Sequence, residues 1–455
     1  MAKVKSKYVC QQCGYESAGY LGKCPECGSW SSFIEEITTS SSEKKISAII
    51  TDSCPVKINE ITTNQETRFA TTISEFDRVL GGGIVQGSVI LLAGDPGIGK
   101  STLLLQTSGT LTNSGKKVLY TSAEESLSQI KLRAERLKIT SDSLYIYSQT
   151  NLEAIKKQIE EIKPNLVIID SIQAIYSQEV QSTAGSVSQI RECCNSLINI
   201  AKNNNIAIII IAHVTKEGNI AGPKVLEHMV DAVIQFEGDK YKSHRILRSI
   251  KNRFGNTSEV GIFEMEETGL REILNPSELF IKDIDNTHAP GSVTIVTNEG
   301  SRPLLVEIQA LVGTTPYPTP RRVANGVDTG RVHQILAVLE KRVGLNLSKQ
   351  DVYVNVIGGM DITETAADLG IALAITTCAR DIILDKTTAI VGEIGLSGEI
   401  RAVNNIEKRI IEAQKLGFKK ILIPHMNSLT KEITGINIIK VKNILEAFNQ
   451  GLTKE

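Results

Sequence analysis

A phosphate-loop motif between residues 88 and 102 constrains the fold of this chain more than any other feature. Residues 88–93, Ser-Val-Ile-Leu-Leu-Ala, form an apolar run typical of a buried strand, and a glycine-rich turn follows it. Lys100 and Ser101 then open an apolar helical pattern that lasts until about Gly115. A strand, the turn G-x-x-x-x-G-K-[ST] and a helix in this order predict a nucleoside-triphosphate site. The residues predicted to hold the nucleotide in this loop are Gly94, Asp95, Pro96, Gly97, Ile98, Gly99, Lys100, Ser101 and Thr102.

Each part of this motif has a chemical task. Glycines let successive backbone N–H groups turn inward around the β-phosphate, and the helix N-terminus adds the positive end of its dipole. Lys100 would reach the β- and γ-phosphates, and the hydroxyl of Ser101 would bind Mg²⁺. The alternative is a glycine-rich turn without a ligand, but the flanking strand and helix favour ATP with Mg²⁺.

Strands and helices alternate from residue 67 to residue 275, which predicts a parallel sheet with helices on both faces. Functional residues of such sheets gather at the carboxyl ends of the strands. The expected strands are residues 88–93, 117–121, 143–147, 165–170 and 206–212, and the expected helices are residues 126–138, 151–162 and 187–203.

Three of these strands end in polar residues that suit nucleotide hydrolysis. Asp170 is placed to hold the magnesium ion through water, although a buried-strand aspartate can also cap a helix. Glu124 or Glu125 could polarise the attacking water, and either one could instead be an ordinary acid in the first turn of a helix. His213 is a candidate sensor of the γ-phosphate, with a loop histidine as the alternative.

Four cysteines near the N-terminus predict a zinc site. Cys10 and Cys13 form one C-x-x-C pair and Cys24 and Cys27 a second, and a glycine follows each pair. Two such knuckles can deliver four thiolates to one tetrahedral Zn²⁺, whereas a redox C-x-x-C needs only one pair in a thioredoxin-like unit. The module is basic, so it could contact a phosphate backbone, but it could equally dock a protein.

Length and composition limit the remaining possibilities. A chain of 455 residues with 41% hydrophobic and 22% charged residues is expected to form two or three globular domains. The net charge of −1 gives no overall attraction to nucleic acid, so DNA binding would need local basic patches. We expect no secretory signal and no membrane span, and the eight cysteines suit a reduced, cytoplasmic compartment.

The rest of the chain divides by composition. Residues 35–66 are expected to form a linker with a short strand near 46–50, and residues 276–284 a connector. From residue 290 we expect strands at 292–297, 304–310 and 352–356 and helices at about 330–343 and 364–380. The predicted domains are therefore a zinc module (1–34), a nucleotide-binding domain (67–275) and a C-terminal domain (285–455).

Basic residues before residue 256 form a further candidate site. The stretch 248–255, Arg-Ser-Ile-Lys-Asn-Arg-Phe-Gly, is expected to project its cations from one face of a strand. The partner could be DNA or the nucleotide of a neighbouring subunit, and the alternative is a solvated edge strand. A Pro-rich loop at 314–322 ends in Arg321 and Arg322, which could contact phosphate or lie on an exposed turn.

The four-cysteine module, the glycine-rich core at 81–101 and the string Lys251-Asn-Arg-Phe-Gly255 together resemble the RadA (Sms) family of bacterial DNA-repair and recombination ATPases. The resemblance covers nearly the whole chain. It implies an N-terminal zinc ribbon, a RecA-like P-loop ATPase and a C-terminal α+β domain like the proteolytic domain of Lon. It also implies a homo-hexameric ring that acts on single-stranded and branched DNA, drives branch migration and works with a RecA-type recombinase.

The same resemblance assigns roles to residues. Lys100 and Ser101 match the Walker A residues, Asp170 the Walker B acid and Glu124 the catalytic glutamate. Lys251 and Arg253 match the family motif that reaches toward nucleotide or DNA.

The resemblance to Lon proteases raises a rival function, an ATP-dependent peptidase. Alignment with the Lon motifs puts Asp368 at the position of the serine nucleophile and Glu407 at the position of the lysine base, with Lys408 one residue away. Neither carboxylate can do the chemistry of that dyad. We therefore expect a domain that has kept the fold without the peptidase, and that contacts subunits and phosphates through cations such as Arg321, Arg322 and Arg331. A third hypothesis is a signalling ATPase like the clock protein KaiC, against which the zinc module argues.

Overall fold

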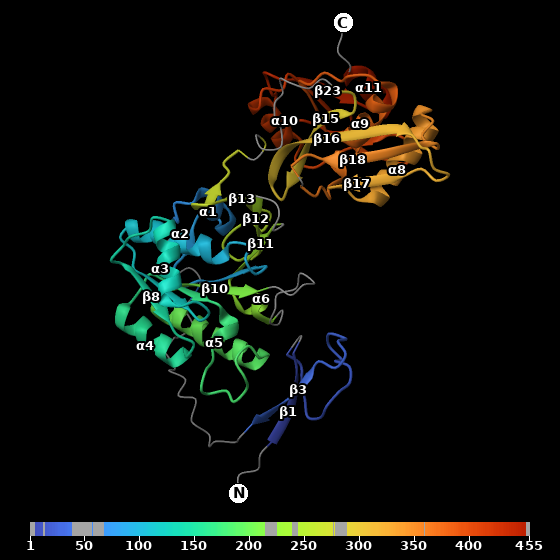
Figure 1. Ribbon diagram of the computed structural model, residues 1–455. Coiled ribbons are helices and arrows are strands. Elements are labelled where there is room, and N and C mark those ends of the chain that lie inside the picture. The colour runs from blue at the N-terminus through green and yellow to red at the C-terminus, as the bar shows by residue number, and fades with distance from the viewer. Residues whose placement is uncertain are drawn as a thin grey trace. The chain divides into compact units, whose positions relative to one another are not determined.

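The computed structural model describes residues 5–11, 14–38, 57, 68–213, 225–238, 244–275, 277, 289–358 and 360–451 (Figure 1). Contacts divide the chain into two compact units, Met1–Leu274 and Asn275–Glu455. Cys13, the strand expected near 46–50 and the connector expected at 276–284, apart from Ser277, lie outside the described residues.

The N-terminal module is a small antiparallel sheet. Its strands β1 (Lys5–Cys10), β2 (Glu16–Ser17) and β3 (Phe33–Thr38) pair in the order β2-β1-β3. Strand β3 pairs with the whole of β1, from Cys10 opposite Phe33 to Lys5 opposite Thr38. The regular structure thus extends four residues into the segment that the sequence analysis assigned to the linker.

A nine-stranded sheet forms the centre of the predicted nucleotide-binding domain, in the order β14-β13-β12-β11-β6-β10-β9-β7-β8. The strands from β11 to β8 are parallel, as predicted, whereas β12, β13 and β14 continue the sheet antiparallel. The elements in chain order are β4 (Arg68–Phe69), α1 (Ser74–Leu80), β5 (Ile84–Val85), β6 (Val89–Gly94), α2 (Lys100–Asn113), β7 (Val118–Ser122), α3 (Leu127–Arg136), β8 (Leu144–Ser148), α4 (Leu152–Ile162), β9 (Leu166–Asp170), α5 (Val187–Asn204), β10 (Ala207–His213), α6 (Val225–Met229), β11 (Ala232–Glu237), β12 (His244–Asn252), β13 (Val260–Glu266) and β14 (Gly269–Glu272).

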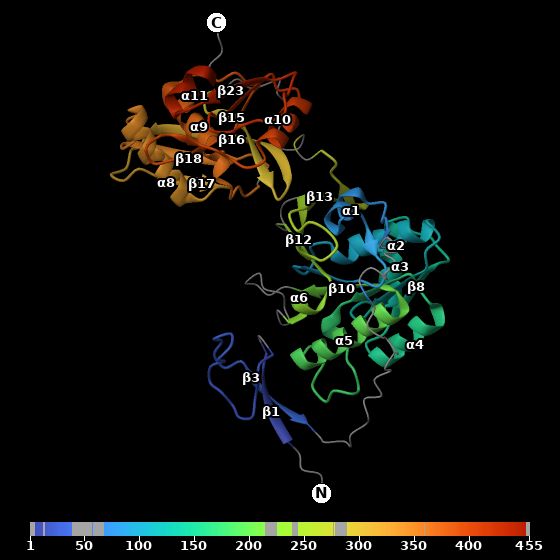
Figure 2. The ribbon, with the colours of Figure 1, turned by 180° about the vertical axis from the view of Figure 1, so that it is seen from behind.

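Helices cover both faces of this sheet because its central strands are apolar on both sides. Leu103 and Leu104 of α2 pack with Ile90 and Leu92 of β6, in a cluster that also contains residues of α1 and α3. The alternate residues of β6 pack in a second cluster with α4, α5 and α6. Since side chains alternate along a strand, the two helix groups lie on opposite faces, as the two views in Figures 1 and 2 allow the reader to follow.

Polar caps fix where several helices begin. Ser126 and Gln129 form a capping box at α3, in which each side chain bonds the other residue's backbone N–H. The side chains of Asn151 and Ser186 cap α4 and α5 in the simpler manner.

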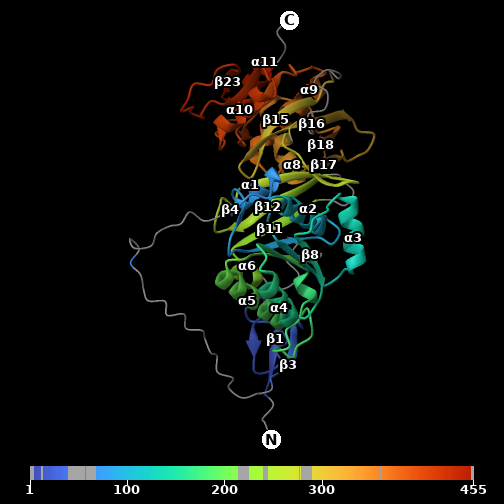
Figure 3. The same cartoon turned by 90° about the vertical axis from the view of Figure 1, so that its left-hand side faces the viewer.

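The C-terminal unit is built on a mixed sheet in the order β17-β18-β16-β15-β19-β22-β23. Helix α9 packs on the face that carries Ile295, and α10 on the face that carries Val296, so the two helices lie on opposite sides of β15 (Figure 3). The elements are β15 (Ser292–Glu299), β16 (Arg302–Thr314), β17 (Arg322–Asn325), α8 (Thr329–Val338), β18 (Gln350–Val356), α9 (Asp368–Arg380), β19 (Thr388–Ile390), β20 (Glu393–Ile394), β21 (Ile400–Arg401), α10 (Ile406–Lys415), β22 (Lys420–Pro424), β23 (Asn437–Val441) and α11 (Ile444–Gly451).

Candidate functional site

The sheet brings the ends of its central strands together beside the phosphate loop. In the strand order β6-β10-β9-β7, Gly94 at the end of β6 lies opposite His213 at the end of β10. Asp170 at the end of β9 lies opposite Ser122 at the end of β7, two residues before Glu124. The predicted nucleotide, metal and base residues therefore share one edge of the sheet.

The phosphate loop is closely packed against the neighbouring strand. A Cβ atom on Gly94 would lie 2.7 Å from the carbonyl oxygen of Phe236 in β11, so only glycine fits there. Lys100 is almost fully buried, and its ammonium group donates to the carbonyl oxygens of Gly94 (2.7 Å) and Asp95 (2.9 Å). Burial lowers the pKa of Lys100 to about 8, partly offset by the nearby carboxylates.

Asp170 is a buried carboxylate fixed by two hydroxyl groups. The hydroxyl of Tyr120 on β7 donates to Asp170 Oδ2 at 2.6 Å, and Ser101 also hydrogen-bonds the carboxylate. Burial raises the pKa of Asp170, and these two hydrogen bonds oppose the shift. Ser101 and Asp170 therefore present adjacent oxygen atoms, the ligand type that Mg²⁺ prefers.

Glu124 is connected to the phosphate loop through His213. His213 Nε2 lies 3.1 Å from Glu124 Oε1, and His213 Nδ1 lies 3.4 Å from the ammonium nitrogen of Lys100. Ser171 donates a second hydrogen bond to the same carboxylate oxygen. Burial alone would raise the pKa of Glu124, but the hydrogen bonds from Ser171 and His213 outweigh it and lower the pKa overall.

Glu125 has a different environment. Its carboxylate accepts from Arg133 Nη2 at 2.6 Å, and its backbone N–H donates to the hydroxyl of Ser122. This ion pair ties Glu125 to helix α3. Of the two acids that the sequence offered as a base, Glu124 is the one whose carboxylate contacts Ser171 and His213 beside the phosphate loop.

Lys251 and Arg253 contact groups of their own chain. The Lys251 ammonium donates to the carbonyl oxygens of Glu227 (2.9 Å) and Val230 (2.9 Å) at the end of α6. Arg253 Nη1 lies 3.0 Å from Asp231 Oδ1. The other oxygen, Asp231 Oδ2, accepts a hydrogen bond from the backbone N–H of Val89, the first residue of β6. The motif is thus joined to the strand that carries the phosphate loop.

The expected row of cations on one strand face is formed only in part. Arg248 and Lys251 are three residues apart, but a register shift at Ile250 puts both on the same face of the ladder. Arg253 follows the last residue of β12 and is not on that strand.

Three of the four predicted zinc ligands come together. Ligand atoms of Cys10, Cys24 and Cys27 lie within 4.8 Å of one another, and Cys13 lies outside the described residues. Gly14 and Gly28 have positive φ angles of 78° and 72°, as a tight turn behind each cysteine pair requires. A cluster of thiols with this spacing fits the soft-ligand preference of Zn²⁺.

The C-terminal unit holds a pocket of about 490 Å³ at the position aligned with the protease nucleophile. Asp368, at the start of α9, is buried and accepts two hydrogen bonds from Arg331, one of them at 2.7 Å from Nε. Burial raises the pKa of Asp368, against the effect of Arg331. Arg331 forms an ion pair with the buried carboxylate of Asp368. The expectation that Arg331 is a cation available to phosphate therefore does not fit the structure.

The other two predicted cations are also engaged. Arg321 stacks on the ring of Tyr317 at 4.1 Å, and Arg322 donates to the carbonyl oxygens of Leu347 and Gln350. These contacts involve no carboxylate, and among the described residues neither arginine forms an ion pair.

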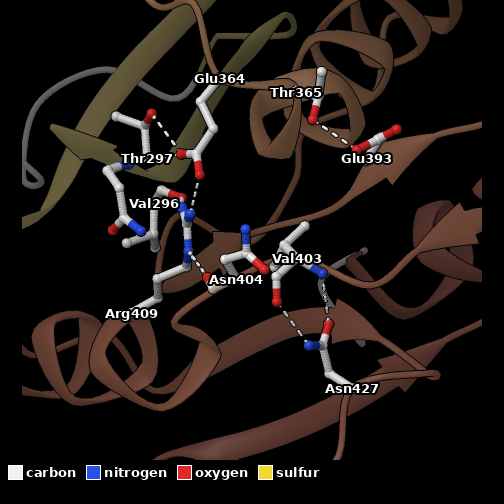
Figure 4. Close-up of polar contacts among 10 residues, drawn as sticks. Val296, Thr297, Glu364, Thr365, Glu393, Val403, Asn404, Arg409 and Asn427 are labelled. Atoms are coloured by element: carbon white, nitrogen blue, oxygen red, sulfur yellow. Dashed lines mark hydrogen bonds and ion pairs between the residues drawn. The ribbon is translucent and has the colours of Figure 1, made fainter. Parts of the chain in front are cut away.

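Glu407, at the position aligned with the protease base, hydrogen-bonds Thr430 rather than Asp368. Helix α10 directs Arg409 into the domain beside its apolar residues, and Arg409 is fully buried. Arg409 donates to the carbonyl oxygens of Val296 (2.6 Å) and Asn404 (3.0 Å) and pairs with Glu364, as Figure 4 shows. Glu364 in turn lines the pocket.

Three residues at the ATPase site were not predicted from the sequence. Tyr120 and Ser171 bond the two carboxylates, and Arg245 on β12 donates to the carbonyl of Ile98 in the phosphate loop at 3.2 Å. Of these three, only Ser171 could have been noticed in the sequence, because it directly follows the predicted Walker B acid.

Family models match three parts of the chain. A rubredoxin metal-binding domain model matches residues 8–35, an AAA domain model residues 56–219 and a model for subunit ChlI of Mg-chelatase residues 328–427. The DNA repair protein RadA of Bacillus subtilis (strain 168) is 50% identical over 458 residues, covering 99% of this chain and 100% of the relative. RadA of Listeria monocytogenes is 51% identical over the same shares, and RadA of Streptococcus pyogenes serotype M1 is 50% identical over 99% of both chains.

The chain belongs to the RadA family of DNA repair proteins. Its membership confirms the resemblance drawn from the cysteine module, the phosphate loop and the Lys251–Gly255 string. The predicted fold is also confirmed: a zinc ribbon, a P-loop ATPase domain and a C-terminal domain of the ChlI and Lon type. No helix among the described residues of this RadA-family chain is long and apolar enough to cross a membrane.

Proposed function

We propose that this chain is a DNA-dependent ATPase of recombination and repair that moves on single-stranded DNA and promotes branch migration. One observation carries the ATPase part: five residues meet at one sheet edge in two hydrogen-bonded groups, Lys100 with His213 and Glu124, and Ser101 with Asp170. The names of the RadA relatives support the DNA-repair part.

In this proposal each side chain acts at a defined point of ATP hydrolysis. Lys100 and the loop N–H groups neutralise the phosphates, and Ser101 and Asp170 would hold Mg²⁺, which would supply further positive charge to the phosphates. Glu124 accepts the proton of the attacking water. His213, between Lys100 and Glu124, responds to the γ-phosphate.

We further propose that the chain acts as a homo-hexamer on single-stranded and branched DNA, together with a RecA-type recombinase. In such a ring, Lys251 and Arg253 would face the neighbouring subunit's nucleotide or the DNA. The contacts of Lys251 are to carbonyl oxygens, which do not neutralise its charge, and the side chain of Arg253 is half exposed although it pairs with Asp231.

We do not expect peptidase activity. The nucleophile position holds Asp368, whose carboxylate is bonded to Arg331, and the base position holds Glu407, which is bonded to Thr430. Neither arrangement provides a hydroxyl nucleophile next to a neutral amine.

The decisive experiment measures ATP hydrolysis by the full chain with and without single-stranded DNA, and casein cleavage in the same preparations. We expect hydrolysis that DNA stimulates and no cleavage of casein. Lys100→Ala should abolish hydrolysis in both conditions. Hydrolysis that DNA leaves unchanged would contradict the DNA-dependent function, and ATP-dependent cleavage of casein would support the protease hypothesis instead.

A further inference from the structure

Both hydrogen bonds to the candidate base fall on the same carboxylate oxygen. Ser171 Oγ donates to Glu124 Oε1, and His213 Nε2 lies 3.1 Å from that atom. Among the described residues, no hydrogen bond reaches Glu124 Oε2. One oxygen is therefore fixed by the protein, and the other is left to accept a proton.

The hydroxyl of Ser171, which donates, has less freedom to move than the carboxylate of Glu124, which accepts. Ser171 is fully buried and directly follows β9, which pairs with β10 on one side and β7 on the other. The side chain of Glu124 is 44% exposed and stands in the loop after β7, on a chain with three rotatable bonds. A carboxylate in that position would sample several rotamers unless a buried group held it.

We propose that Ser171 is a positioning residue for ATP hydrolysis, holding Glu124 Oε1 so that Oε2 points at the attacking water. This inference rests on the proposed ATPase function. In the reaction, the water oxygen bonds to the γ-phosphorus while the bond from phosphorus to the β–γ bridging oxygen breaks. The water proton passes to Oε2, and the products are ADP and inorganic phosphate.

His213 supports the same geometry from the nucleotide side. Its Nδ1 faces the Lys100 ammonium, which can only donate, so Nδ1 accepts and Nε2 carries the proton. The imidazole therefore donates to Glu124 Oε1 as Ser171 does. Among the described residues, no hydrogen bond joins Ser171 to the phosphate loop or to Lys100, which separates its effect from nucleotide binding.

The test is a mutant cycle between Ser171 and Glu124 in the full chain, with ATP hydrolysis and nucleotide affinity both measured. Ser171→Ala should lower kcat by about 10- to 100-fold and leave KM for ATP within about twofold. In the Glu124→Gln background, Ser171→Ala should cause no further loss, because there is no base left to position. Ser171→Thr, which keeps the hydroxyl, should recover most of the activity.

Ser108→Ala is the matched control. Ser108 is another fully buried serine of the same domain, and its hydroxyl donates to the carbonyl oxygen of Leu104 at 2.7 Å, its one side-chain hydrogen bond within the described part of the chain. Its removal should leave kcat and KM near those of the unaltered chain. If Ser171→Ala does not fold, Ser171→Cys is used instead, because a thiol is a weaker hydrogen-bond donor of similar size. The same loss of kcat is then expected, but smaller than for Ser171→Ala.

Two results would overturn the inference: an unchanged kcat in Ser171→Ala, or an equal further loss when Ser171→Ala is added to Glu124→Gln. The second would mean that Ser171 acts independently of the base. A chain that hydrolyses no ATP at all, before any substitution, would instead refute the proposed function.

Discussion

At the scale of single residues, the two adjacent acids Glu124 and Glu125 differ in what they contact. Glu124 lies between Ser171 and His213, whereas Glu125 forms an ion pair with Arg133. The sequence pattern after the strand could not separate them, because the two acids are adjacent and lie two and three residues beyond the end of β7. The hydrogen bonds of Glu124 to Ser171 and His213 separate the two acids, because they depend on which strands are neighbours in the sheet.

We expect Glu124→Gln to slow ATP hydrolysis by about 10²- to 10⁴-fold while nucleotide binding is kept, because a general base contributes about that much. Glu125→Gln is the matched control and should hydrolyse ATP within a few-fold of the unaltered rate. Steady-state kinetics with a fluorescent-nucleotide binding assay measures both. A Glu125→Gln variant slower than Glu124→Gln would reverse the assignment.

At the scale of elements, helix α5 carries two buried thiols. Cys193 and Cys194 are fully buried, and burial raises the pKa of each to about 12. At pH 8 a thiol with that pKa is ionised in only about one molecule in ten thousand, and the fraction rises tenfold per pH unit. Iodoacetamide should therefore leave both cysteines unmodified in the folded chain at pH 8 and alkylate them in urea, as peptide mass spectrometry can follow. Rapid alkylation without urea would contradict the buried placement of α5.

The start of helix α9 depends on an ion pair with α8. Arg331→Ala would leave the carboxylate of Asp368 buried without its partner, which should lower the free energy of unfolding by about 3 kcal/mol. Arg401→Ala is the control, because the pair of Arg401 with Glu399 is exposed and should contribute less than about 1 kcal/mol. Urea unfolding of the full chain measures the difference. Equal effects of the two substitutions would argue against a structural role for the Arg331–Asp368 pair.

The central strands could be predicted from the sequence, while several contacts at the site could not. A strand buried on both faces is a continuous apolar run, so β6, β9 and β10 are visible as such. The antiparallel strands β13 and β14 have no such run and were not predicted. The contact of Tyr120 with Asp170 joins residues 50 positions apart, and it exists only because β7 and β9 are neighbours in the sheet.

At the scale of the whole molecule, the zinc module is expected to fold separately from the ATPase domain. The unaltered chain should bind one zinc ion, and Cys27→Ala should bind less than one. The substitution should also unfold the module, because so small a core depends on the metal. ATP binding should persist, because the Lys100 site draws on none of the module's residues. Elemental analysis and nucleotide binding test the two parts. Loss of both properties would show that the domains are not independent.

The order of strands in the ATPase sheet has a consequence for how the chain folds as it is synthesised. Strand β6, which carries the phosphate loop, is the first long strand of its domain, yet its two neighbours are β10 and β11. A nascent chain must therefore reach Glu237 before both edges of β6 are paired. Until then an apolar strand remains open to other chains, so folding of this domain is slow and non-local, and premature termination before that residue yields an aggregation-prone fragment.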